Sequence, residues 1–183
     1  LRTPEKRTYV RTLRCNTKQE HFGELPPRYN FMLNPYPDQR VSRCPMCEQK
    51  TNQRKLPLLI HIDPLRLIAL NYICRYCREC DLLIAHKHEI EHILTELFRQ
   101  SDPAVIGNGY LIIGTVEKRI WREGLKQPKG LAEILSQASD FAEYYTELRL
   151  TQPGYFRADQ EPPVMEPPLS QEWVKAKPVP RRR

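Results

Sequence analysis

The chain has 183 residues, of which 40% are hydrophobic and 28% charged, and its formal net charge is +7. This composition argues against a fully disordered chain and suits one compact unit with extensions. No apolar run approaches the ~18 residues needed to span a bilayer, so we do not expect a membrane protein.

The first 43 residues carry nine Lys/Arg against four Asp/Glu and show no clean apolar period. Turn signals such as Pro26-Pro27 interrupt them further. We therefore expect residues 1–43 to form an extended basic arm. Its charge permits contact with a polyanion such as nucleic acid, and ordinary solubility charge is the competing interpretation.

The next segment has the pattern of short strands. Alternating apolar residues over 56–62 predict one strand, and the apolar run 67–73 predicts its partner after the Asp63-Pro64 turn signal. A third short strand is expected at 82–86. The three strands predict a hairpin followed by a return strand.

Residues 88–100 place apolar side chains at helical spacing, so we expect a helix that ends at the Ser101-Asp102-Pro103 stretch. The run 110–116 predicts another strand, with Ile120 and Trp121 in its partner. A second helix is expected over about 131–148. Seven of the last 33 residues are proline, which is typical of a disordered or linker-like tail.

Five of the six cysteines gather between residues 44 and 80, while Cys15 lies apart in the arm. A C-x-x-C turn aims two sulfurs at one point, and two such turns joined by a hairpin supply the four thiolates that suit Zn²⁺. Such a cluster favours metal ligation in a reducing cytoplasm over a secreted disulfide framework.

The first pair of ligands is Cys44 and Cys47. The second pair comes from Cys74, Cys77 and Cys80, whose C-x-x-C registers overlap. We favour Cys77 with Cys80, because a strand follows directly after them. The alternative register uses Cys74 in place of Cys80.

The segment from Cys44 to His86 resembles a zinc ribbon of the rubredoxin-knuckle type, over about a quarter of the chain. The resemblance implies three strands pinned by one structural Zn²⁺, and it implies little about function because ribbons serve many roles. We therefore predict an α+β fold: a small three-stranded zinc ribbon, then a helix, a short strand pair and a helix, with extended termini. The expected division is arm 1–43, ribbon 44–87, an α/β extension 88–150 packed on the ribbon, and tail 151–183.

His88-Glu89-Ile90-Glu91-His92 matches the H-E-x-x-H pattern of zinc peptidases. Glu91 is unusual in that pattern, the first histidine falls at a helix end, and the sequence offers no convincing third ligand. A metallopeptidase on His88, Glu89 and His92 is therefore the least favoured of three hypotheses about function.

The favoured hypothesis about function is a cytoplasmic, non-enzymatic zinc module that contacts nucleic acid or a nucleoprotein assembly. The other is a protein-interaction or scaffold subunit with purely structural zinc. No motif indicates a small-molecule substrate.

Overall fold

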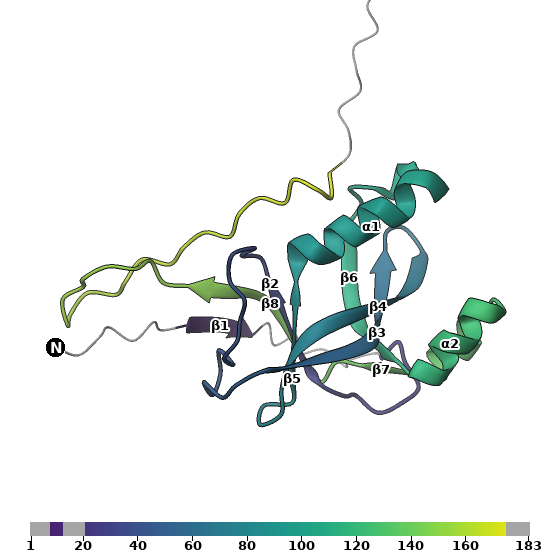
Figure 1. Ribbon diagram of the computed structural model, residues 1–183, viewed down its shortest axis with the longest axis horizontal. Coiled ribbons are helices and arrows are strands. Elements are labelled where there is room, and N and C mark those ends of the chain that lie inside the picture. Colours follow the sequence, from purple (N-terminus) through teal and green to yellow (C-terminus); the bar gives the residue numbers. More distant parts are fainter. Residues whose placement is uncertain (1–7, 13–20, 175–183) are drawn as a thin grey trace, which may run out of the picture.

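The computed structural model describes residues 8–12 and 21–174 and arranges them around one mixed, curled sheet of eight strands (Figure 1). The strand order across the sheet is β1-β8-β2-β5-β4-β3-β6-β7. In chain order the elements are β1 (Thr8–Thr12), β2 (Asn30–Asn34), β3 (Asn52–Ile62), β4 (Arg66–Cys77), β5 (Leu82–His86), α1 (Lys87–Ser101), η1 (Pro103–Val105), β6 (Tyr110–Val116), α2 (Lys118–Lys126), α3 (Leu131–Leu135), β7 (Ala138–Asp140) and β8 (Glu143–Leu150).

The β3–β4 hairpin is the longest antiparallel pair and confirms the strands expected there. It pairs continuously from Asn52 opposite Tyr76 to Ile62 opposite Arg66. Both strands are longer than their apolar runs, because polar residues next to the cysteines continue the ladder. β5, β6 and α1 also lie close to their expected bounds.

The predicted fold class is wrong in its main feature. The described residues form a large mixed sheet with few helices, and among them no separate three-stranded ribbon precedes a helical part. The presence of both helices and strands is the part that agrees with α+β. Within residues 21–43 the expectation of an extended arm failed, because β2 lies inside the sheet, parallel to both β5 and β8. Residues 1–7 and 13–20 of the predicted arm lie outside the described residues. Strand β2 is buried along most of its length, which its short apolar run did not reveal.

The expected helix over 131–148 is also wrong. Only α3 is helical there, and β7 and β8 replace the remainder. The carboxylate of Asp140 accepts hydrogen bonds from the backbone N–H groups of Phe22 and Gly23, both at 2.8 Å. Phe141 stacks on Phe31 of β2 with 4.4 Å between ring centroids. These long-range contacts stabilise extended backbone here, although the spacing of the apolar residues suits a helix. Ile120 and Trp121, expected in a strand, belong to α2.

The two faces of the sheet carry different layers. We call the face that packs on α1 the helix face, and its core includes Leu58, Tyr72, Cys74 and Leu94. The opposite face, which we call the cysteine face, has two smaller cores. One contains Cys44, Cys77, Met32, Leu82 and Ile84, and the other places Leu59 against Ile120 of α2. None of the helices among the described residues is long and apolar enough to cross a membrane.

The chain after β8 folds back along the molecule and reaches α1 (Figure 1). Met165 donates its N–H to the carbonyl of Leu150 at 2.7 Å, and its own carbonyl accepts a hydrogen bond from Tyr36 Oη at 2.8 Å. The segment ends in the helix-face core, where the indole of Trp173 is 6% exposed and donates to the carbonyl of Asn108 at 2.8 Å. Cys15 and the arginines at 181–183 lie outside the described residues.

Trp173 anchors this segment, so Trp173→Ala should lower the free energy of unfolding by about 3–5 kcal/mol, as expected for a buried Trp truncated to Ala. The adjacent Val174 is 54% exposed and serves as the matched control, with an expected change within about 0.5 kcal/mol for Val174→Ala. Urea unfolding followed by circular dichroism measures both. Equal stability of the two variants would show that the segment contributes nothing to the fold.

Candidate metal centre

The first cysteine pair sits in a tight turn between β2 and β3. Arg43 and Lys50 form an antiparallel bridge at its base, and Cys44 donates its N–H to the carbonyl of Gln49 at 2.8 Å. Glu48 donates back to the carbonyl of Cys44 at 2.9 Å and has φ of 60°. The left-handed residue reverses the chain directly after Cys47, so that both sulfurs point to the same side.

The second pair repeats this design where β4 ends. Cys77 is the last residue of β4, Cys80 follows in the turn, and Asp81 has φ of 47° before β5 begins. Asp81 accepts a hydrogen bond from Tyr76 Oη at 2.8 Å. Asn30 of β2 secures the turn twice, donating its N–H to the carbonyl of Asp81 and its Nδ2 to that of Cys80.

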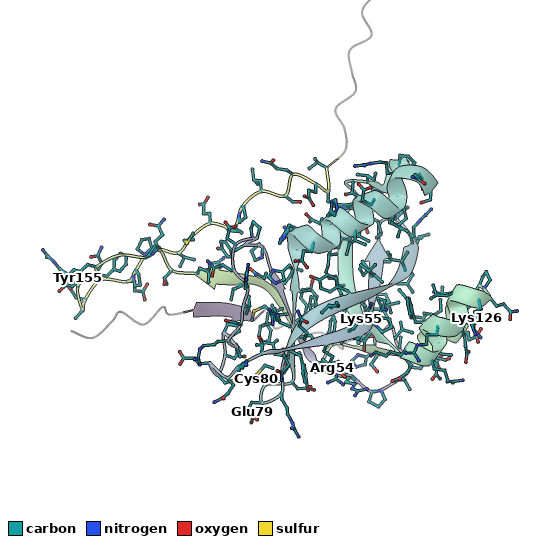
Figure 2. The ribbon with its side chains drawn as sticks, viewed as in Figure 1. Arg54, Lys55, Glu79, Cys80, Lys126 and Tyr155 are labelled. Carbon is teal, nitrogen blue, oxygen red and sulfur yellow. The ribbon has the colours of Figure 1, made fainter. Side chains whose placement is uncertain are left out.

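The four sulfur atoms of Cys44, Cys47, Cys77 and Cys80 all lie within 4.8 Å of one another. Two of the distances are 3.9 Å, from Cys44 to Cys80, and 3.5 Å, from Cys47 to Cys77. A tetrahedral ion with metal–sulfur bonds of about 2.3 Å requires sulfur–sulfur edges of about 3.8 Å. The residues therefore fit one tetrahedral metal ion. Figure 2 shows Cys80 beside Glu79 at this end of the sheet, with Lys126 of α2 far from it.

Burial differs within the cluster and affects the thiols. Cys44 and Cys77 are fully buried, whereas Cys47 and Cys80 are half-buried. Burial raises the pKa of the Cys44 thiol to about 11 and raises the pKa of Cys80 as well. The backbone N–H of Gln49 lowers the pKa of Cys47. An incoming metal ion must displace protons from the buried thiols, so its binding is coupled to pH.

Cys74 lies outside this group. Its side chain is fully buried in the helix-face core, and desolvation raises its pKa. Strand β4 stays extended through Cys77, so residues three apart point to opposite faces and cannot form a C-x-x-C turn. The structure thus separates Cys74 from Cys77 even though the two share a sequence spacing with the true turns.

The H-E-x-x-H residues occupy the start of α1, and other side chains contact Glu89 and His92. His92 is 62% exposed with its Nδ1 3.7 Å from Glu172, and Glu89 accepts a hydrogen bond from Tyr72 Oη at 2.5 Å. The Nδ1 atom of His88 is buried without a hydrogen-bond partner among the described residues. Neither histidine belongs to the cysteine group.

The supporting residues of the centre were not predicted from the sequence. Asn30 lies 50 residues before Cys80, and only the parallel pairing of β2 with β5 brings it there. The left-handed backbone of Glu48 and Asp81 was only weakly indicated by the sequence, because each residue directly follows the second cysteine of a C-x-x-C turn. A glycine at those positions would have been easier to interpret.

No protein-family model, curated protein or solved structure significantly matches this chain. The four-cysteine cluster by itself is consistent with the resemblance to a zinc ribbon. It could bind one metal ion, and the kind of ion has to be judged from the chemistry of these side chains.

The strained backbone at Glu48 gives a direct test of the first turn. Left-handed φ costs a non-glycine residue roughly 1 kcal/mol, and Glu48 is exposed, so Glu48→Gly should stabilise the metal-loaded protein by about 0.5–1 kcal/mol. Glu48→Ala is the matched control, because it removes the same side chain without relieving φ and should bring no such gain. Thermal unfolding of the three proteins measures the difference. A Gly variant no more stable than the Ala variant would contradict the turn geometry.

Proposed function

We propose that Cys44, Cys47, Cys77 and Cys80 hold one Zn²⁺ whose role is structural. The observation that supports this is the packing of four thiol sulfurs at tetrahedral spacing. Thiolates are soft ligands that suit Zn²⁺, and four of them leave no open position for water or substrate. A saturated site of this kind stabilises a fold and does not activate a nucleophile.

The location of the cluster explains why a metal would be needed there. The cysteine-face core around Cys44 and Cys77 is small, and the turn after β2 is held mainly by backbone hydrogen bonds. Structural zinc adds about 10 kcal/mol or more of binding free energy, and this is gained only when the two turns are folded. That is comparable with the whole stability of a typical domain, about 5–15 kcal/mol.

We further propose that the metallated end of the sheet contacts nucleic acid as a non-enzymatic module. Basic side chains flank the cysteines on both turns and on the adjoining hairpin; they are Arg43, Lys50, Arg54, Lys55, Arg75 and Arg78. Within residues 21–174 none of these six takes part in an ion pair. These six cationic side chains outnumber the nearby carboxylates Glu48, Glu79 and Asp81. A small positive charge remains even after the −2 charge of a zinc tetrathiolate is subtracted.

Arg54 is held in a fixed position within this basic group. Its guanidinium lies 5.0 Å from the ring centroid of Tyr29 and 4.7 Å from that of Tyr76, and the two rings meet edge to face at 5.9 Å. Arg54 lies beside Cys80 in Figure 2, and Lys55 lies further along the same strand. A guanidinium already ordered on aromatic rings loses little side-chain entropy when it meets a phosphate or a base.

Zinc content of the purified full chain tests the first proposal. We expect one zinc ion per chain by plasma mass spectrometry, and loss of that ion in Cys77→Ser or Cys80→Ser. Cys74→Ser is the matched control, because Cys74 lies in the other core and its variant should keep the ion. Stoichiometric zinc in Cys80→Ser, or iron as the bound metal in the wild type, would refute the assignment.

Salt dependence of nucleic-acid binding tests the second proposal. The zinc-loaded protein should bind labelled single-stranded RNA or duplex DNA at about 50 mM salt, with affinity that falls steeply by about 200 mM. Lys50→Gln and Arg78→Gln should each reduce the slope of log affinity against log salt by about 0.7–0.9. Fluorescence anisotropy measures these slopes.

Lys126→Gln on α2 is the control for this series, because Lys126 is also exposed but lies far from Cys80 (Figure 2). It should leave the slope unchanged. Absence of binding at low salt would refute the nucleic-acid proposal, and a protein partner retained at high salt would favour the interaction-subunit hypothesis instead.

A further inference from the structure

A polar cavity of about 450 Å³ lies between β4, the loop that follows β2 and the start of α1. Its polar lining comes from Arg40, Gln53, Arg75, His86 and Glu89. The side chains of residues two apart in a strand share a face, so Arg75 lies on the same face as Cys77. The cavity therefore adjoins the candidate metal centre without sharing a ligand with it.

We propose that this cavity binds a small oxyanion that carries both negative charge and a hydroxyl group, namely hydrogen phosphate or a phosphate monoester. Two guanidinium groups and an imidazole N–H supply donors for the charged oxygens, and one carboxylate accepts a hydrogen bond from the hydroxyl group. This inference does not depend on the nucleic-acid proposal, because an internal phosphodiester has no such hydroxyl.

The two arginines provide the positive charge. Arg75 projects from β4 directly opposite Gln53 on β3, and Arg40 comes from the loop after β2. In the part of the chain from 21 to 174, neither Arg40 nor Arg75 forms an ion pair. Guanidinium groups bind phosphate oxygens with paired, charge-assisted hydrogen bonds. Both side chains are thus available to an anion in the cavity.

The protonation of His86 is set by a buried neighbour. The amide of Asn34 is oriented by two backbone groups: its Oδ1 accepts the N–H of Tyr36 at 3.0 Å, and its Nδ2 donates to the carbonyl of Gln39 at 2.9 Å. The remaining Nδ2 proton points to Nδ1 of His86 at 3.1 Å, so Nδ1 is an acceptor. His86 is then a neutral imidazole with its proton on Nε2, in agreement with burial that lowers its pKa.

Glu89 gives the site its selectivity. Its Oε2 accepts a hydrogen bond from Tyr72 Oη at 2.5 Å, and the same hydroxyl accepts the N–H of His86 at 3.3 Å. The other carboxylate oxygen can accept a hydrogen bond from a hydroxyl group of the ligand. A fully ionised sulfate meets this carboxylate as a like charge, whereas hydrogen phosphate donates its hydroxyl to it. Two guanidinium groups against one carboxylate leave the lining with a net positive charge.

The proposal is tested by titrating the zinc-loaded full chain with inorganic phosphate and with sulfate. Calorimetry measures the affinities, and NMR of the His86 ring nitrogens shows whether the anion binds in this cavity. Phosphate should bind at least about tenfold more tightly than sulfate. Arg40→Gln and Arg75→Gln should each weaken phosphate about tenfold. Glu89→Gln should remove most of the preference for phosphate over sulfate. Arg122→Gln, an exposed arginine on α2, is the matched control and should change neither affinity.

Arg40 and Glu89 are exposed, so their variants should fold, and thermal unfolding of each protein checks this. The proposal is overturned if phosphate leaves the His86 resonances unmoved, if both arginine variants bind as the wild type does, or if sulfate binds as tightly as phosphate. Competition by a 5′-phosphorylated oligonucleotide, compared with the same strand unphosphorylated, identifies a nucleic-acid end as the source of the phosphate. Competition only by a free phosphate monoester identifies a small metabolite.

Discussion

The parallel pairing of β2 between β5 and β8 is the constraint on which both the four-cysteine cluster and the adjoining cavity depend. At its start, Asn30 holds the second cysteine turn through the carbonyls of Cys80 and Asp81. At its end, Asn34 stands beside His86 in the register of β2 and β5 and fixes the tautomer of that imidazole. A shift of one residue in this register would turn both asparagines to the other face and separate them from their partners.

Strand alternation then distributes the chemistry of β4 between two environments. Tyr72 and Cys74 point into the core beneath α1, while Arg75 and Cys77 point to the cysteine face. One strand therefore supplies a buried thiol that only packs and, three residues later, a thiol that joins the sulfur cluster. Tyr72 links the two layers, since its hydroxyl reaches both the N–H of His86 and the carboxylate of Glu89.

The local parts of this molecule could be predicted from the sequence, and the non-local parts could not. The alternating residues of β3, the helical stripe of α1 and the grouping of Cys44, Cys47, Cys77 and Cys80 are patterns within short windows. The place of β2 depends on partners far along the chain, and its five residues give no periodic signal. In β7 and β8 the apolar spacing suits a helix, but the contacts of Asp140 and Phe141 with distant segments favour strands. The prediction of the fold class failed because the fold class depends on these long-range strand pairings.

The same non-local pairings suggest why a metal would sit where it does. α1 covers the helix face with Ile90, Leu94 and Phe98, but α2 covers only the part of the cysteine face near Leu59. Neither helix covers Gln53, Ile73 and Arg75, which remain at least partly exposed. The end of the β3–β4 hairpin away from its turn therefore has little apolar surface to bury. Four metal–sulfur bonds would close that end without a helix, and they would leave the adjoining cavity and its cations accessible to ligands. A hydrophobic cover in the same place would stabilise the hairpin while burying Arg75, and an unpaired buried guanidinium is costly. Metal ligation at the four cysteines would therefore reconcile a stable hairpin end with an open, positively charged face.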